Sequence, residues 1–138
     1  MVWMSKIFID TSGFKALVDE KDDFHGKAVK LWGKLLRLDD GFVVSNYILD
    51  ESLTLVRMRR GLDKVLKLRD FIAESSQVIK IYRVSIEDER GAWKWFEKDW
   101  SKLSFTDCVS FALMERLGIK RVFGFDKHFE RAGFELVK

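Results

Sequence analysis

The stretch KIFIDTSG (residues 6–13) joins a short apolar run to an aspartate and then to small residues that can begin a helix. This order predicts a buried strand over residues 6–10 that leads directly into a helix. The order returns in GFVVSN (residues 41–46), where Asn46 is the expected N-cap of the following helix. Strands that alternate with helices in this way predict a mainly parallel sheet.

The same alternation extends along the rest of the chain. Hydrophobic residues at helical spacing, with Gly61 as a break, predict helices over residues 25–38, 46–60, 62–75, 86–100, 106–117 and 128–132. Short apolar runs predict strands over residues 6–10, 41–45, 78–82, 121–125 and 134–137. We therefore expect an α/β fold with three layers, in which a mainly parallel sheet of about five strands has helices on both faces. One domain is expected to span residues 1–138.

Composition restricts the classes of protein to which the chain can belong. Of its 138 residues, 47% are hydrophobic and 34% charged, which is typical of a folded globular protein. The single cysteine, Cys108, excludes an intramolecular disulfide, and two histidines disfavour a zinc site of Cys and His ligands. The net charge of +3 fits a polyanionic partner only weakly. No signal peptide or membrane-spanning run follows Met1 or Met4, the two possible starts, so we expect a cytoplasmic protein with no membrane partner.

Three aspartates are expected at one edge of the sheet. Asp10 closes the first strand, Asp126 follows the fourth, and Asp107 opens the helix before the fourth strand. Ligands of open α/β sheets bind beyond the carboxyl ends of the strands, at the point where the strand order reverses. The sequence therefore predicts that these three carboxylates meet at that edge.

Glu51 is the fourth candidate, in the helix after the second strand. It shares a stripe with Ile48, Leu55 and Met58 at helical spacing, so it borders the predicted apolar face. Its neighbour Asp50 lies on another stripe, which a solvated helix surface explains adequately. We therefore expect Glu51, rather than Asp50, to join the three aspartates.

Four carboxylates held together repel one another, and a bound cation relieves that repulsion. An all-oxygen ligand set suits Mg²⁺ or Mn²⁺, which also bind substrate phosphate through their remaining positions. Phosphoryl chemistry is the natural use of such a site, because the metal lowers the pKa of a bound water and aims it at phosphorus. For the acid/base pair of a metal-free ribonuclease the chain has only His25 and His128, far apart in sequence, so we disfavour that mechanism.

Each acid also has a purely structural interpretation. Asp10 can accept hydrogen bonds from the next backbone amides, and Asp126 can begin the short helix that follows it. Asp107 fits a capping box that starts at Ser104, and Glu51 can pair with a nearby lysine or arginine. The shared placement of the four acids at one edge, rather than any single acid, supports the functional interpretation.

Two further patterns are compatible with RNA binding or with structure alone. Trp93, Phe96 and Trp100 could stack on bases, but their helical spacing favours a place in the core. A basic run could follow an RNA backbone, dock an acidic partner or form a solvated helix pair; it comprises Arg57, Arg59, Arg60, Lys64, Lys67 and Arg69. Neither pattern decides the function.

Four stretches carry the candidate acids in order along the chain. They are IFIDTSGF with Asp10, VVSNYILDESLTLVR with Ser45 and Glu51, LSFTDCVSFALMERLGI with Thr106 and Asp107, and RVFGFDKHFERAGFELV with Asp126. Together they resemble the PIN-domain family, and within it the VapC-type toxins of bacterial and archaeal toxin–antitoxin pairs. Each stretch alone is a weak signal, whereas four with this order and spacing are specific.

The resemblance implies a PIN-like sheet with helices on both faces, metal-dependent cleavage of RNA, homodimerisation and inhibition by a small antitoxin protein. It also implies that the catalytic metal ligands are Asp10, Glu51, Asp107 and Asp126. Supporting hydroxyl groups are implied at Thr11, Ser12, Ser45 and Thr106. Many members carry Thr or Ser where this chain has Gly124, so a hydrogen bond near Asp126 is expected to be missing here.

Two rival functions are compatible with the same residues. A housekeeping PIN nuclease that processes RNA would share this site, although the chain length favours the toxin. A catalytically silent RNA-binding or scaffolding module would keep the fold without needing all four acids. The favoured hypothesis is an endoribonuclease that uses Mg²⁺ or Mn²⁺ and acts as the toxin of a VapBC-type pair.

Overall fold

The computed structural model describes residues 5–138, so the two possible starts, Met1 and Met4, lie outside the described residues. Within that range the chain forms one five-stranded sheet with the order β3-β2-β1-β4-β5. Every neighbouring pair of strands is parallel. The strands are β1 (Lys6–Ile9), β2 (Gly41–Ser45), β3 (Ile79–Tyr82), β4 (Arg121–Phe123) and β5 (Glu135–Leu136). The predicted α/β fold class with a parallel sheet is confirmed.

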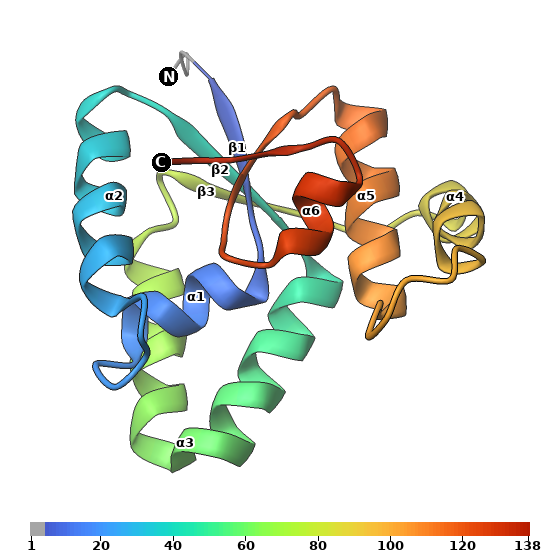
Figure 1. The fold of residues 1–138 in the computed structure, drawn as a ribbon. Coiled ribbons are helices and arrows are strands. Elements are labelled where there is room, and N and C mark those ends of the chain that lie inside the picture. Colours follow the sequence, from blue (N-terminus) through green and yellow to red (C-terminus); the bar gives the residue numbers. More distant parts are fainter. Residues whose placement is uncertain (1–4) are drawn as a thin grey trace.

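Helices cover the sheet on both faces, with α2 and α5 on opposite sides of it (Figure 1). On one side α1 packs against α2 and α3, and on the other α5 packs against α4 and α6. The helices are α1 (Thr11–Val18), α2 (His25–Arg37), α3 (Asn46–Glu74), α4 (Ile86–Phe96), α5 (Phe105–Leu117) and α6 (Lys127–Arg131). The predicted three-layer arrangement is therefore present.

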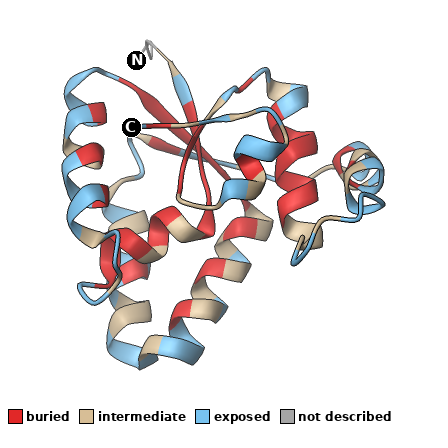
Figure 2. Ribbon diagram, viewed as in Figure 1, coloured by how far each residue is buried: buried red, intermediate tan, exposed pale blue. Residues whose placement is uncertain are grey.

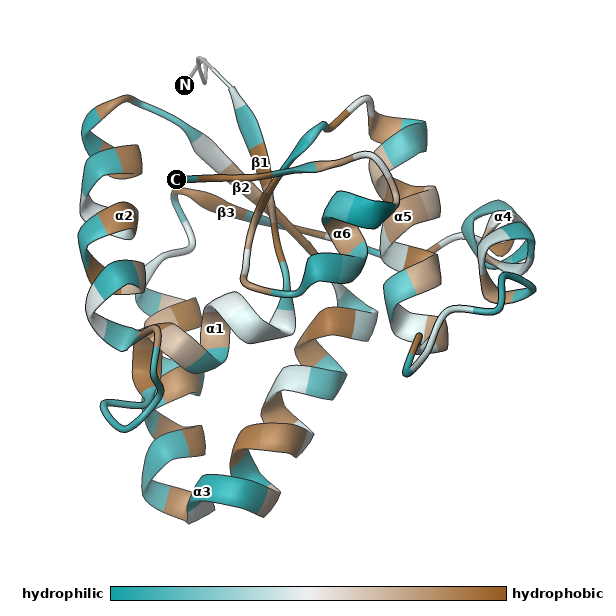
Figure 3. Cartoon of the chain, viewed as in Figure 1, coloured by the Kyte–Doolittle hydropathy of each residue, from teal (hydrophilic) through white to brown (hydrophobic). Residues whose placement is uncertain are grey.

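The core fills the space between the sheet and both helical layers. All five residues of β2 are buried, and β1 is buried after its first residue (Figure 2). Hydrophobic residues follow the strands and alternate with hydrophilic ones along the helices (Figure 3). On one face Trp32 stacks on Phe42 with ring centroids 4.2 Å apart, and on the other Phe111 meets Phe129 at 5.0 Å. A parallel sheet that is buried on both sides explains why its strands read as continuous apolar runs.

Several predicted boundaries differ from the structure. Ser45, not Asn46, is the N-cap of α3, because the Ser45 Oγ accepts a hydrogen bond from the backbone amide of Ile48 at 3.1 Å. Asn46 instead accepts from the amide of Val84 through its side chain at 2.8 Å. The helix predicted to reach Trp100 ends at Phe96. Differences of a few residues at helix ends are the least predictable part of a sequence-based assignment.

The interpretation of the aromatic stripe as core is wrong for Trp93 and Phe96, whereas Trp100, which lies beyond α4, packs against the core. Trp93 is 54% exposed and Phe96 is 39% exposed, while Trp100 is partly buried. Both exposed rings rest on Phe105 of α5, with centroids 5.3 Å from it. Helical spacing correctly placed the first two on one stripe, but that stripe lies at the border of the α4–α5 contact rather than inside it.

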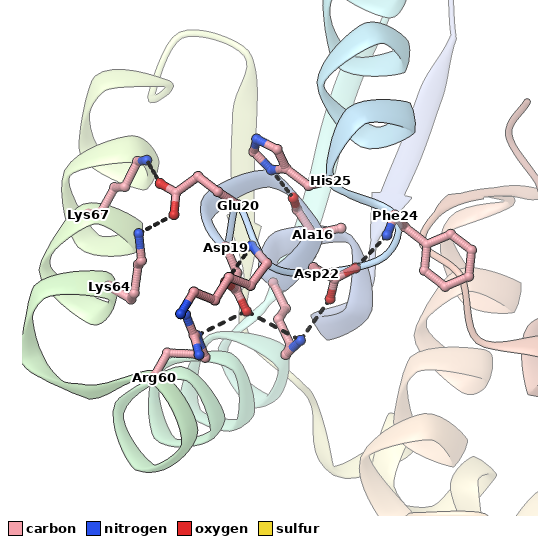
Figure 4. Close-up of polar contacts among 11 residues, drawn as sticks. Ala16, Asp19, Glu20, Asp22, Phe24, His25, Arg60, Lys64 and Lys67 are labelled. Atoms are coloured by element: carbon pink, nitrogen blue, oxygen red, sulfur yellow. Dashed lines mark hydrogen bonds and ion pairs between the residues drawn. The ribbon is translucent and has the colours of Figure 1, made fainter.

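A break at Gly61 divides α3 into two arms, as predicted. Gly61 has φ 85° and ψ −176°, a conformation that side chains with a Cβ rarely adopt. The loop between α1 and α2 holds the second arm, since Glu20 pairs with both Lys64 and Lys67 (Figure 4). Arg60, at the break, pairs with Asp19 at 3.2 Å. Part of the predicted basic run is thus neutralised by acids of this chain.

Candidate active site

The candidate site lies beyond the carboxyl ends of β1 and β4, next to the point where the strand order reverses. Asp10 follows β1 and is the N-cap of α1, and Asp126 stands just past β4 and is the N-cap of α6. Asp107 lies in the first turn of α5, and Glu51 lies in the first arm of α3. Four separate elements thus converge on one edge of the sheet, where ligands bind in this class of fold.

All four predicted acids line one cavity of about 370 Å³. The lining residues are Asp10, Thr11, Ser12, Lys15, Asp22, Phe24, Glu51, Leu55, Asp107, Phe125 and Asp126. The structure therefore brings together residues that are up to 116 positions apart, from Asp10 to Asp126. A cavity in which several polar groups converge beside apolar side chains is a typical arrangement for a small active site.

Hydroxyl groups of α1 hold two of the carboxylates. Ser12 donates from its Oγ to Asp10 Oδ2 at 2.7 Å, and Thr11 donates from its Oγ1 to Glu51 Oε1 at 2.6 Å. Ser52 donates in turn to the Thr11 Oγ1 at 3.0 Å. These contacts match the predicted placement of Thr11 and Ser12 beside the acids and fix the orientation of both carboxylates.

Asp107 satisfies the structural interpretation and also reaches the cavity. It forms the predicted capping box with Ser104, whose Oγ accepts from the Asp107 amide at 3.0 Å. In return Asp107 Oδ2 accepts from the Ser104 amide at 3.4 Å. A capping role and a role in the site are therefore compatible, because a carboxylate offers two oxygens with several lone pairs.

Two of these acids resist ionisation in the absence of a cation. Burial, together with the charge of Asp126, raises the pKa of Asp10 to about 6, although the hydrogen bond from Ser12 opposes the rise. Burial and the nearby Asp10 and Asp126 raise the pKa of Asp107 to about 7. Carboxylates that are buried and crowded in this way favour either a proton or a positive ion beside them.

Besides Lys15 and Asp22, which line the cavity, sequence reasoning missed His128. It is the second residue of α6, and its Nδ1 lies 3.2 Å from Asp126 Oδ1 and 3.5 Å from Asp107 Oδ2. One ligand atom from each of these three residues lies within 4.8 Å of the others, which is close enough to share a metal ion. Its position two residues after a candidate acid was the only sequence signal, and that signal is weak.

The two remaining supporting residues lie differently from Thr11 and Ser12. Ser45 is fully buried, and its hydroxyl group caps α3 rather than contacting a carboxylate. Thr106 lines a neighbouring hollow beside Glu51 and accepts a hydrogen bond from Ser110 through its backbone carbonyl at 2.9 Å. Any effect of Ser45 on Glu51, or of Thr106 on Asp107, would therefore act through the position of the first turn of α3 or α5 and not through a direct hydrogen bond.

β4 ends at Phe123, earlier than predicted, and Gly124 follows it close to the site. A Cβ at this position would lie 3.0 Å from both Asp10 Cβ and Ser12 Oγ. The Ser12 hydroxyl also accepts from the Phe125 amide at 2.9 Å, so the chain leaves the sheet after Phe123 to meet it. Gly124 supplies no side-chain hydrogen bond to Asp126, which accepts instead from the backbone amide of His128 at 2.9 Å.

Gly124→Ala is expected to displace Asp10 and to lower the free energy of unfolding by roughly 1–3 kcal/mol, the usual cost of overpacking. Gly26→Ala is the matched control, because a Cβ there meets nothing within 4 Å. The control should be neutral or stabilising by up to about 1 kcal/mol, since alanine favours a helix. Urea denaturation measures both, and equal effects in the two variants would contradict the packing argument.

An open groove continues from the cavity along α3. A hollow of about 620 Å³ shares Glu51 and Leu55 with the cavity and is lined further along by Met58 and Arg59. Met58 is 80% exposed, so the predicted apolar stripe through Glu51 leaves the core before it reaches this residue. The groove offers a path for a polymer substrate beside the four acids.

An aromatic pair forms another wall of the cavity. Phe24, which is 46% exposed, stacks on Phe125 with ring centroids 4.4 Å apart and planes inclined by 5°. Lys27 places its Nζ 5.9 Å from the Phe125 ring centroid. An exposed ring face next to a cation is suited to contact with a nucleobase and its phosphate.

The PIN domain family model matches residues 7–135, and this chain belongs to the PIN domain family. A relative, the 23S rRNA-specific endonuclease VapC20 of Mycobacterium tuberculosis, is 34% identical over 133 residues. The match covers 96% of this chain and 98% of that protein. The family resemblance of the four acid-bearing stretches is thus confirmed over nearly the whole chain.

Solved structures agree with this assignment. The crystal structure of M. tuberculosis VapC20, described as a toxin that cleaves the sarcin-ricin loop, has a TM-score of 0.82 and 33% identity, covering 93% of this chain and 95% of that one. Two further structures share the fold. VapBC2 from Rickettsia felis has a TM-score of 0.66 and 13% sequence identity, and the match covers 95% of this chain and 96% of that one. FitAcB from Neisseria gonorrhoeae has a TM-score of 0.65 and 15% sequence identity, and the match covers 96% of each chain.

Within residues 5–138, no helix combines the length and the hydrophobicity needed to cross a bilayer.

Proposed function

We propose that this chain, as a single PIN domain over residues 1–138, is a metal-dependent endoribonuclease that acts as the toxin of a VapBC-type toxin–antitoxin pair. The observation that carries the proposal is the meeting of four carboxylates, from Asp10, Glu51, Asp107 and Asp126, in one cavity. The family and the 34% identity to a ribosomal RNA endonuclease support the same reaction class. A scaffold would have no need for four acids that repel one another.

The residues of the cavity fit a divalent cation. Asp10 and Asp107 are buried close to other carboxylates, and burial together with these neighbouring charges raises the pKa of each. Oxygen donors of this kind suit Mg²⁺ or Mn²⁺. Such an ion, held by the four acids, would supply an activated water and neutralise charge on the phosphate.

The protein's own part in the reaction is to position groups. Ser12 and Thr11 hold the carboxylates of Asp10 and Glu51 in fixed orientations, which lowers the cost of arranging ligands at each turnover. The exposed face of Phe24 can stack on a base next to the scissile phosphate, and stacking of this kind tolerates any base sequence. Sequence preference would then come from the shape of the RNA.

Arg59 is proposed to contact the RNA backbone in the groove. It is exposed, it lines the hollow beside Glu51, and no ion pair of its side chain is found among residues 5–138. Arg60, Lys64 and Lys67, by contrast, already face acids of this chain. Arg57 is also exposed without an ion pair among residues 5–138, but of the predicted basic run Arg59 alone lines the hollow beside Glu51, where it has access to a phosphate.

Arg59→Ala is expected to weaken RNA binding several-fold. The slope of the logarithm of the binding constant against the logarithm of the salt concentration should become shallower by about one, as the loss of one phosphate contact predicts. Arg69→Ala is the matched control, because Arg69 is exposed on the second arm and pairs with Asp70. Binding is measured over a salt series in an Asp10→Asn background, so that the RNA stays intact. An unchanged slope for Arg59→Ala would place the RNA elsewhere.

We propose 23S ribosomal RNA as the substrate, with the sarcin-ricin loop as its target, because the relative with 34% identity carries that specificity in its description. The proposal includes a cytoplasmic location, a homodimer and a small antitoxin as inhibitor. Expression in a bacterial host should stop growth, and co-expression of the small protein encoded beside it should restore growth. Growth that continues on expression of the intact wild type would favour a housekeeping nuclease, and RNA binding without cleavage would favour a silent module.

A further inference from the structure

His128 is held against two of the acids by its place in α6. Asp126 caps this short helix by accepting from the backbone amide of His128 at 2.9 Å, which brings the imidazole over the same carboxylate. The His128 Nδ1 lies 3.2 Å from Asp126 Oδ1 and 3.5 Å from Asp107 Oδ2. The nitrogen therefore faces the gap between one acid of α5 and one acid before α6.

The other ring nitrogen fixes which atom carries hydrogen. His128 Nε2 lies 2.9 Å from the carbonyl oxygen of Ser101. A carbonyl can only accept a hydrogen bond, so Nε2 must donate. In the neutral ring this leaves a lone pair on Nδ1, the nitrogen that faces Asp107 and Asp126.

Nδ1 is shielded from solvent and, among residues 5–138, has no hydrogen-bond partner. Both carboxylate oxygens lie within 3.5 Å of Nδ1, yet neither contact has the geometry of a hydrogen bond. A buried polar atom without a partner is costly unless a ligand satisfies it. The lone pair of Nδ1 therefore faces the space beside Asp107 Oδ2 and Asp126 Oδ1, where a cation could bind all three atoms.

We propose that His128 Nδ1 is a nitrogen ligand of the divalent cation, beside Asp107 and Asp126. The proposal rests on the metal-dependent function proposed above. Neighbouring ligands of a six-coordinate ion with bonds of about 2.1 Å lie about 3 Å apart, close to the separations of Nδ1 from the two oxygens. Donation from Nε2 to a backbone carbonyl is also the usual second contact of a metal-bound histidine.

A nitrogen ligand has a consequence for metal choice. Imidazole suits Mn²⁺ only moderately and Co²⁺ or Zn²⁺ better, whereas Mg²⁺ prefers oxygen. His128→Ala is therefore expected to weaken Co²⁺ binding by about 10- to 100-fold and Mg²⁺ binding much less. His25→Ala is the matched control, because the only other histidine bonds the Ala16 carbonyl through its Nδ1 at 2.7 Å, away from the acids.

Pulsed electron paramagnetic resonance of bound Mn²⁺ tests the proposal without any assay of cleavage. Nuclear modulation from ¹⁴N is expected in the wild type and in His25→Ala and should be absent in His128→Ala. Because a variant can fold poorly, the wild type labelled with ¹⁵N-histidine provides a second test, in which the ¹⁴N modulation should change to that of ¹⁵N. All samples are prepared in a buffer without amines.

The outcomes separate this inference from the proposed function. Mn²⁺ that binds tightly to the wild type but shows no histidine nitrogen would overturn the role of His128 and leave the carboxylate site intact. Nitrogen modulation that persists in His128→Ala would also overturn it. Failure of the wild type to bind Mn²⁺ at all would overturn both. Equal loss of Co²⁺ and Mg²⁺ affinity in His128→Ala would identify His128 as a residue that only positions Asp107 and Asp126.

Discussion

Asp10→Asn is expected to reduce RNA cleavage at least about 100-fold, since even the loss of a group that merely orients a metal ligand commonly costs 10- to 100-fold. Asn has nearly the shape of Asp and can still accept from Ser12, so the fold should survive. It lacks the negative charge that holds a cation. Cleavage of ribosomes by purified wild-type and Asp10→Asn proteins in Mn²⁺ measures the effect.

The matched control for this loss is Asp63→Asn. Asp63 is exposed on the second arm of α3 and does not line the cavity, and its replacement removes the same unit of charge. Its cleavage rate should equal that of the wild type. If Asp10→Asn cleaved RNA at the wild-type rate, Asp10 would have only the capping role that its contact with Ser12 already provides.

The second large effect concerns the stability of the metal-free protein, which is expected to fall as pH rises from about 4 to about 7. Asp10 and Asp107 have folded-state pKa values of about 6 and about 7, above the ordinary 3.8. The native state therefore binds more protons than the unfolded state in this range, and ionisation favours unfolding. A shift of the size seen at Asp10 corresponds to about 3 kcal/mol. The two contributions do not simply add, because the charge of Asp10 is one cause of the raised pKa of Asp107.

Urea denaturation in EDTA at several pH values measures this dependence. Asp107→Asn should flatten it, because the buried charge is gone while Asn can still cap α5. At pH 8, Mn²⁺ should raise the melting temperature of the wild type, since the ion binds only the folded site, and should raise that of Asp107→Asn less. An identical pH dependence in both proteins, or an equal shift with Mn²⁺, would mean that the cation lies elsewhere.

Local sequence predicted the framework of the fold. The runs in residues 6–10 and 41–45 are apolar throughout because their strands are buried on both faces, and the helix breaks at Gly61 because only glycine tolerates that conformation easily. Boundaries were predicted less well where distant residues decide them. Strand β4 ends at Phe123 because the amide of Phe125 bonds to Ser12, a contact across the fold.

The acids of the site were predictable because parallel strands deliver their ends to one edge. His128 was not, because its role depends on where α6 lies relative to α5 and on a carbonyl at Ser101. The exposure of Trp93 could not be predicted either, because helical spacing defines which residues share a face but not how closely the neighbouring helix covers that face. Spacing along one element is visible in a sequence, whereas the fit between elements is not.

In the proposed function, four carboxylates hold a cation that activates water for the cleavage of RNA. The most direct test is to incubate purified wild-type protein with intact ribosomes in Mn²⁺, then with EDTA, and then with Mn²⁺ restored in excess, and to map any new ends in the ribosomal RNA. We expect a specific cut in 23S ribosomal RNA that disappears with EDTA and returns with Mn²⁺. Cleavage that persists in EDTA would contradict the claim, as would intact RNA under all three conditions.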